Sequence, residues 1–143
     1  MIRATLDVNV LVSGFPESSG APGELIAWWL GRRFSLVLSE HILSTLAAVW
    51  GRPYWRAHFE QDKVRRAIDL LRARAVFVAP DLTIRGVAVN DEDDMILGTA
   101  VAGKVDYLVT GDKPLRALGR YQNVVILSPR EFLDILEFDA SRL

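Results

Sequence analysis

Acidic residues at two places in this chain have the types and positions that oxygen-liganded metal chemistry requires. The stretch NDEDDMILGTAVAGKVDYLVTGDK, residues 90–113, holds consecutive carboxylates from Asp91 to Asp94 and a further one at Asp112. Far away in the chain, Asp7 directly follows an apolar run. Mg²⁺ and Mn²⁺ prefer oxygen ligands, and a bound metal activates water and neutralises charge on a phosphoryl transition state. The pattern therefore indicates phosphodiester hydrolysis as the candidate chemistry.

The acidic run also has a structural interpretation. Negative side chains at the start of a helix interact favourably with its dipole, by about 0.3 to 1 kcal/mol each. Asp91, Glu92 and Asp93 fit helix-start charge or an outer rim of a site equally well. Asp7 and Asp112 favour the metal hypothesis more strongly, because each follows a strand-like run and lies outside the acidic run itself.

Alternating strand and helix patterns must position these residues. Apolar runs predict strands at residues 2–6, 34–38, 75–78, 107–110 and 124–127, and turn formers between residues 13 and 20, Ser18 among them, predict a loop. Helical spacing predicts helices at residues 22–33, 39–51, 61–75, 95–102 and 129–137. This order predicts an α/β fold with a mostly parallel sheet, whose ligands lie at the carboxyl ends of the strands. Asp7, Asp94 and Asp112 are expected to converge there.

Length and composition limit the classes of protein. A chain of 143 residues is expected to form one domain, residues 1–143, and its net charge of −1 gives no global attraction to nucleic acid. The absence of cysteine excludes disulfides, thiolate zinc sites and cysteine nucleophiles, and it fits a reducing cytoplasm. No apolar stretch reaches the roughly 18 residues that predict a membrane span.

Three stretches of the chain resemble PIN domains, and more narrowly the PIN-fold toxins of bacterial and archaeal toxin–antitoxin pairs. They are LDVNVLVSG at 6–14, SEHILSTLAAVWGRP at 39–53 and DEDDMILGTAVAGKVDYLVTGDKPLRAL at 91–118. The resemblance covers nearly the whole chain and implies a three-layer α/β/α fold. It also implies a ribonuclease that depends on Mg²⁺ or Mn²⁺, an RNA substrate, a cognate antitoxin protein and a homodimer.

The resemblance also implies roles for individual residues. Carried over by position, Asp7, Asp94 and Asp112 would be the catalytic metal ligands. The supporting residues that it implies are Asn9, Ser13, Glu40, Asp91, Asp93 and Thr110. Arginine suits phosphate contacts, so Arg52 and Arg56, with Lys113 beside Asp112, are candidates to guide RNA, although a solvated face explains them as well.

One position departs from the family pattern. The family places a glutamate in the helix after the second strand, and Thr45 stands there, followed by Leu46. Glu40 lies about 140° around the helix and about 7.5 Å along it, so it cannot simply replace that carboxylate. Two functions therefore remain open: a metal-dependent endoribonuclease, and a PIN-fold module that binds RNA or an antitoxin through a weakened or inactive site. A phosphatase or receiver-like domain is less consistent, because Asp7 does not begin an Asp-x-Asp motif.

Overall fold

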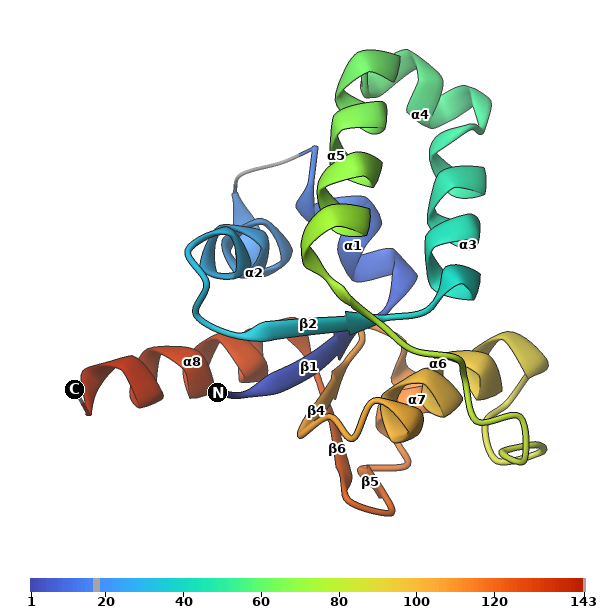
Figure 1. The fold of residues 1–143 in the computed structure, drawn as a ribbon, viewed down its shortest axis with the longest axis vertical. Helices are drawn as coiled ribbons and strands as arrows, with labels where there is room; N and C mark the ends of the chain where they lie inside the picture. The colour runs from blue at the N-terminus through green and yellow to red at the C-terminus, as the bar shows by residue number, and fades with distance from the viewer. Residues whose placement is uncertain (17–18, 143) are drawn as a thin grey trace.

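The computed structural model of the protein describes residues 1–16 and 19–142. Its centre is a sheet with the strand order β3-β2-β1-β4-β6-β5 (Figure 1). The strands are β1 (Arg3–Leu6), β2 (Ser35–Leu38), β3 (Val76–Phe77), β4 (Tyr107–Val109), β5 (Arg120–Tyr121) and β6 (Val124–Leu127). The pairs β3–β2, β2–β1, β1–β4 and β4–β6 are parallel, whereas β5 pairs with β6 in the antiparallel direction. The prediction of a mostly parallel sheet is confirmed.

Helices cover both sides of this sheet. They are α1 (Val8–Gly14), α2 (Gly20–Leu30), α3 (Glu40–Trp50), α4 (Pro53–His58), α5 (Gln61–Arg74), α6 (Asp91–Ala102), α7 (Lys113–Arg116) and α8 (Pro129–Ser141). In Figure 1, α1 to α5 stand on one side of β2, and α6 and α7 lie on the other. Helix α1 packs on α2 and α3, α2 on α8, and α6 on β1, β2 and β4. The expected three-layer α/β/α arrangement is confirmed.

Helices α3, α4 and α5, residues 40–74, form a helical arm that projects from the sheet (Figure 1). Trp50 at the end of α3 is fully buried. Its ring centroid lies 5.8 Å from that of Phe15 after α1 and 5.2 Å from that of Phe59 after α4, in edge-on arrangements. Such aromatic pairs add about 0.5 to 1.5 kcal/mol each beyond the area that they bury. The arm is thus fastened to α1 at the level of Trp50.

Side-chain caps explain where several helices begin. Ser39 Oγ accepts from the Ile42 N–H at 3.3 Å before α3, and Asn90 Oδ1 accepts from the Asp93 N–H at 2.8 Å before α6. Satisfying an otherwise unpaired N–H in this way stabilises a helix by about 1 kcal/mol. The Asn90 cap starts α6 at Asp91, four residues before the apolar pattern predicts, so the whole acidic run lies in the first turn of the helix.

The segment after β1 differs from the prediction of a loop. Residues 8–14 form α1, with Val8, Val10 and Leu11 buried. Three valines in this run have a strand-like pattern, and tertiary burial overrides it. A Cβ on Gly14 would lie 2.7 Å from Ile26 Cγ1, so the glycine permits the close approach of α1 and α2. Ser18 of the predicted loop lies outside the described residues.

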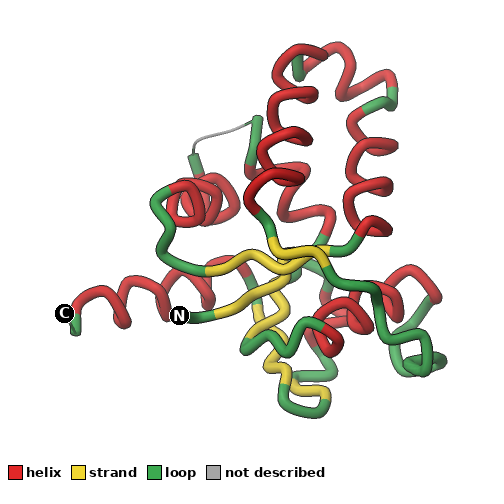
Figure 2. Tube along the Cα trace, in the orientation of Figure 1, coloured by secondary structure: helices red, strands yellow, loops and turns green. Residues whose placement is uncertain are grey.

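The segment between β3 and α6, residues 78–90, runs without regular secondary structure (Figure 2). It carries the chain from the edge strand β3 across to the start of α6, next to the carboxyl ends of the central strands. Among the residues 1–16 and 19–142, no helix is long and apolar enough to cross a membrane.

Candidate active site

Asp7 follows β1 and is buried, with a residual exposure of 4%. Its Oδ1 accepts from the Val8 N–H at 2.6 Å and its Oδ2 accepts from the Thr110 hydroxyl at 2.6 Å. The parallel pairing of β1 with β4 sets this contact, because it places Leu6 beside Val109 and therefore Asp7 beside Thr110. The predicted position of Asp7 at the carboxyl end of a strand is thus the observed one.

Asp112 joins this edge of the sheet from the turn after β4. Its backbone N–H donates to Thr110 Oγ1 at 3.0 Å, and its Oδ2 accepts from the Leu115 N–H at 3.1 Å, which caps the short helix α7. Thr110 is fully buried and contacts both acidic residues, accepting from one and donating to the other. The threonine hydroxyl therefore fixes the separation of two acidic residues that belong to one site.

Asp94 is buried, but its carboxylate is turned toward the 78–90 segment. Its Oδ2 accepts from the Gly86 N–H at 2.9 Å, and its Oδ1 accepts from the N–H groups of Val87 at 3.2 Å and Ala88 at 2.7 Å. These three charge-assisted hydrogen bonds hold the segment against the start of α6. The role that the structure gives to Asp94 is therefore the anchoring of a loop, in contrast to the expected membership of the acidic cluster.

Asp93 lies within electrostatic reach of the other two carboxylates. Neighbouring helical residues point about 100° apart, so Asp93 and Asp94 cannot share one direction. The pKa of Asp93 is raised to about 6, first by partial burial and then by the charges of Asp112, Asp7, Glu92 and Asp94, in that order. The acidic cluster therefore consists of Asp7, Asp93 and Asp112, with Glu92 beside it.

The pKa of Asp7 is also raised. Burial is the main cause, and the charges of Asp112 and Glu92 add to it, whereas the hydrogen bonds from Thr110 and Val8 lower the pKa in part. Like charges that raise one another's pKa in this way lie within electrostatic reach of each other. The negative charges of the cluster therefore repel one another, and a bound divalent cation would neutralise part of this charge.

The donors present fit a hard cation. All the groups of the cluster are carboxylate or hydroxyl oxygens, the ligands of Mg²⁺ and Mn²⁺, and Mg²⁺ commonly takes only one or two carboxylates and keeps several waters. Within the part of the chain that the structure describes, no three histidine or acidic side chains already stand in a metal-holding geometry. The fit therefore rests on the donor chemistry and on the mutual repulsion of the cluster.

Helix α3 meets the cluster through Thr45 and His41. The Thr45 hydroxyl lies 2.9 Å from the His41 carbonyl oxygen and 3.3 Å from Glu92 Oε1, and His41 Nε2 lies 3.0 Å from Glu92 Oε2. Glu40, a predicted supporting residue, is turned outward and pairs with Arg72 of α5 at 2.6 Å. The local sequence gives no signal for these contacts beyond the spacing of His41 and Thr45, which puts both on one face of α3.

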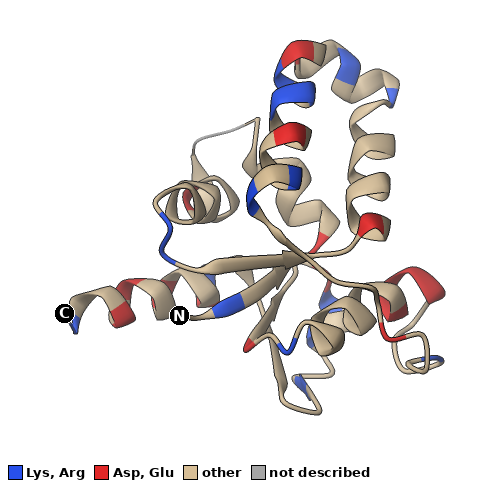
Figure 3. Cartoon of the chain, in the orientation of Figure 1, with Lys and Arg blue, Asp and Glu red and all other residues tan. Residues whose placement is uncertain are grey.

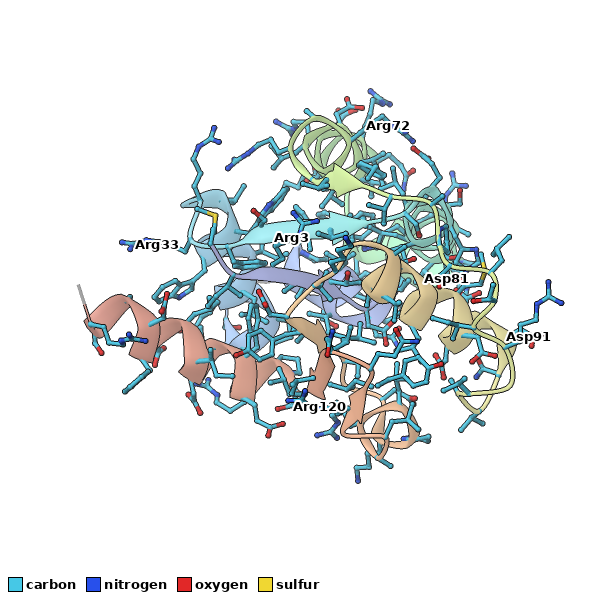
Figure 4. All side chains as sticks on the ribbon, turned by 60° about the horizontal axis from the view of Figure 1, so that its bottom comes forward. Arg3, Arg33, Arg72, Asp81, Asp91 and Arg120 are labelled. Carbon is cyan, nitrogen blue, oxygen red and sulfur yellow. The ribbon has the colours of Figure 1, made fainter. Side chains whose placement is uncertain are left out.

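The other predicted residues lie further out. Asn9 and Ser13 are exposed on α1, and Asp91 is exposed at the outer end of α6 (Figure 4). Lys113 is exposed directly after Asp112, at the start of α7. Figure 3 shows basic residues along the helical arm and acidic residues at the start of α6. Arg52 and Arg56 belong to that arm, at its end distant from the strand edge (Figure 1).

The fold and the acidic cluster together define the class of protein: an α/β protein with carboxylates gathered at the ends of parallel strands. A family model described as PIN domain matches residues 3–114, the part of the chain from β1 to α7 that contains the acidic cluster. The chain therefore belongs to the PIN-domain family, and the resemblance seen in the sequence is confirmed. No curated protein matches the chain.

Solved structures share the fold at low sequence identity. One is VapBC2 from Rickettsia felis bound to a DNA fragment from their promoter, with a TM-score of 0.61 and 14% identity. Another is FitAcB from Neisseria gonorrhoeae, with a TM-score of 0.57 and 17% identity. Each alignment covers 89% of this chain and 98% of the matched chain. At these identities the likeness shows a common fold.

Proposed function

We propose that the protein is a metal-dependent endoribonuclease, the toxin of a toxin–antitoxin pair. The observation that carries this proposal is the convergence of Asp7, Asp93 and Asp112 from three separate segments, where the charge of Asp112 raises the pKa of both Asp7 and Asp93. Membership of the PIN-domain family supports a nuclease, since PIN domains are generally nucleases. The oxygen-only donor set supports Mg²⁺ or Mn²⁺ as the cofactor.

Asp7, Asp93 and Asp112 would hold the metal, with Asp93 in the place that the sequence suggested for Asp94. When bound, the metal would lower the pKa of water and neutralise charge that develops on the phosphodiester. Thr110 holds the Asp7 carboxylate in one orientation through its 2.6 Å hydrogen bond, and the Leu115 N–H does the same for Asp112. Asp94 keeps the neighbouring backbone of residues 86–88 in place.

RNA is the proposed substrate. Lys113 is exposed next to Asp112, where its ammonium group can meet a phosphate that enters the acidic cluster. Arg52 and Arg56 lie on the helical arm and would contact a more distant part of a long RNA strand. The fold shared with VapBC2 and FitAcB, together with the resemblance to PIN-fold toxins, supports a cognate antitoxin, a homodimer and a cytoplasmic location as parts of the same proposal.

The test is cleavage of a defined single-stranded RNA by the purified protein in Mn²⁺. Asp7→Asn removes a charged ligand without changing side-chain size, and we expect it to abolish cleavage. Asp139→Asn on the exposed face of α8 is the matched control and keeps wild-type cleavage. Equal cleavage by Asp7→Asn and wild-type protein contradicts the assignment of the site.

A second candidate is a PIN-fold module that binds RNA or an antitoxin and cleaves slowly or not at all. The observation in its favour is Thr45, a hydroxyl at the position of the expected helix carboxylate. This candidate predicts an RNA that is bound, as measured by fluorescence anisotropy, and recovered intact after prolonged incubation with Mn²⁺.

A further inference from the structure

Residues 52–66 form the tip of the helical arm, at its end distant from the sheet (Figure 1). This arm tip carries Tyr54, which is 61% exposed in α4, whereas the neighbouring Trp55 packs against the hydrophobic core. Burial of an apolar ring stabilises a fold, and Tyr54 forgoes most of that burial. The packing of the chain therefore does not account for an aromatic residue at this position.

The Tyr54 ring is held in one position by its neighbours. It stacks on the His58 imidazole, with ring centroids 4.2 Å apart and 21° between the planes, and it meets the Trp55 ring edge-on at 5.1 Å. His58 Nδ1 also lies 2.6 Å from the Tyr54 carbonyl oxygen, so the imidazole is fixed as well. Because both rings are ordered before any ligand arrives, a flat ligand that stacks on them costs little side-chain entropy.

Arginine side chains occupy the other flank of α4. Successive residues of a helix point 100° apart, so Arg56 lies about 160° around the helix from Tyr54, and the exposed Ala57 lies between the two flanks. Arg52 directly precedes the helix, and both arginines are exposed. Within residues 1–16 and 19–142, neither forms an ion pair with a carboxylate. Helix α4 thus has an aromatic flank and a cationic flank on either side of a small residue.

The arm tip is locally basic although the chain as a whole has a net charge of −1. Basic residues outnumber acidic ones there, with Arg52, Arg56, Lys63, Arg65 and Arg66 against Glu60 and Asp62. Asp62 is already paired with Arg65 at 3.4 Å. Figure 3 shows these basic residues at the end of the arm. A polyanion is therefore attracted to the arm tip by a local field.

We infer that the arm tip binds single-stranded RNA, with an unpaired base stacked on the Tyr54–His58 pair and the adjoining phosphates in contact with Arg52 and Arg56. Proteins that hold single strands combine aromatic rings for the bases with cationic side chains for the backbone. A strand that runs along α4 over Ala57 meets one of these on each side. The inference rests on the proposed RNA substrate and deepens it, because it adds stacking of a base to the contacts with phosphate.

Helix α3 separates the arm tip from the acidic cluster. Its first turn contacts α6 through His41, and α4 follows its last residue. The helix has 11 residues and is therefore about 16 Å long. An RNA bound at both places spans several nucleotides, so only a long RNA uses the arm tip during cleavage.

Binding of a fluorescein-labelled single-stranded RNA of about 16 nucleotides, the upper size of one single-strand site, tests the stacking. In EDTA, where cleavage is prevented, we expect Tyr54→Ala to weaken the affinity measured by fluorescence anisotropy by about tenfold. Tyr54→Phe keeps the ring and should keep the affinity, whereas Tyr54→Leu is apolar without a flat face and should bind as weakly as the alanine variant.

Phe138→Ala is the matched control, because Phe138 is a 67% exposed ring on α8 and its loss should leave RNA affinity unchanged. Double-stranded RNA of the same sequence has its bases already stacked and should bind Tyr54→Ala and the wild type equally. Wild-type affinity for the single strand in Tyr54→Ala overturns the inference and leaves a protein partner as the occupant of the arm tip. Affinity retained in Tyr54→Leu contradicts stacking.

Salt dependence separates the phosphate contacts from the stacking. Arg56→Gln is expected to reduce the slope of log affinity against log salt concentration by about 0.7, the contribution of one neutralised phosphate on a single strand. Tyr54→Ala should keep the wild-type slope, since it removes no charge. Arg120→Gln in β5 removes a charge elsewhere and should also keep it. An unchanged slope in Arg56→Gln overturns the phosphate contact.

Cleavage in Mn²⁺ separates this inference from the proposed function. With the long RNA, Tyr54→Ala should raise KM and keep kcat, and cleavage of a dinucleotide, too short to span α3, should be the same in both proteins. If the wild type binds RNA through Tyr54 but does not cleave it, the arm tip is an RNA site and the nuclease function is wrong. If the wild type cleaves and Tyr54→Ala equals it in affinity and KM, the function stands and the inference is wrong. A wild-type protein that neither binds nor cleaves RNA contradicts both.

Discussion

Asp93 and Asp94 are adjacent acidic residues, and replacing each by asparagine is expected to change stability in opposite directions. Asp94→Asn keeps an oxygen for the N–H groups of Val87 and Ala88 but turns an amide N–H₂ toward the Gly86 N–H, which now donates to Oδ2 at 2.9 Å. Losing one charge-assisted hydrogen bond costs about 1.5 to 3 kcal/mol, and the two others become weaker without the charge. We expect a loss of about 3 kcal/mol in the free energy of unfolding.

Asp93→Asn removes a charge that the fold does not favour. A pKa raised from the ordinary 3.8 to about 6 is equivalent to about 3 kcal/mol in the absence of screening by solvent. Asp93 is only partly buried and solvent screens its interactions, so we expect a gain of about 1 kcal/mol in the free energy of unfolding at neutral pH.

The gain in Asp93→Asn has a definite pH dependence. Because the pKa is higher in the folded state than in the unfolded state, ionisation destabilises the fold of the wild type. Below about pH 4 both states are protonated and the variant gains nothing. As the pH rises toward 6, the wild type loses stability relative to the variant, and above the folded pKa of about 6 the difference stays constant.

Urea denaturation in EDTA at pH 4.5 and 7.5 measures the stability of the two variants. Titration of the folded proteins with Mn²⁺ measures their metal affinity. For a chain of this size about 1 kcal/mol shifts Tm by roughly 3 °C, so Asp94→Asn should melt about 9 °C lower. It should retain Mn²⁺ affinity, whereas Asp93→Asn should be more stable and lose Mn²⁺ affinity by about tenfold or more. The opposite pattern, with Asp94→Asn stable but unable to bind Mn²⁺, would refute the assigned orientations.

Two further substitutions test the supports of the site. Thr110→Val removes the hydroxyl that donates to Asp7 at 2.6 Å and leaves a buried carboxylate oxygen without that donor. We expect the free energy of unfolding, measured by urea denaturation at pH 7.5, to fall by about 2 kcal/mol. This loss should become smaller as the pH falls and Asp7 is protonated. Gly103→Ala adds a Cβ that collides with Val37 Cγ1 between α6 and β2, and we expect a loss of about 1 to 3 kcal/mol with unchanged Mn²⁺ affinity in the folded protein. An unchanged Tm in either variant contradicts the packing described for it.

The strands and most helices follow from local patterns. Short apolar runs ended by turn formers predict β1, β2, β4 and β6 to within a residue or two, because a strand buried on both faces requires a continuous apolar run. Asp7 and Asp112 follow from the same reasoning, since each is the polar residue that comes after such a run at a strand end. Helix α1 does not, because its alternating valines and the turn formers that follow them give no helical pattern, and the helix is stabilised by packing against α2 and α3.

The orientation of the acidic run required the tertiary structure. In α6 the residues from Ile96 to Ala100 are all buried, so this part of the helix has no polar face exposed to solvent. The sequence alone therefore does not show which side of α6 is turned toward the sheet. Nothing in the local sequence therefore predicts which of Asp93 and Asp94 is directed toward Asp7 and Asp112. The loop of residues 86–88 decides it by offering three N–H groups on one side, which draw Asp94 away from the cluster.

The sequence by itself thus determined the parallel sheet, the two strand-end carboxylates and the family resemblance, since each of these depends on residues that are close together in the chain. Only the tertiary structure decided which residues of α6 face the cluster and what lies over Thr45. Glu92 reaches His41 across a separation of 51 residues. That contact exists because α3 and α6 both start at the carboxyl edge of the sheet, and no local pattern encodes the distance between two such helices.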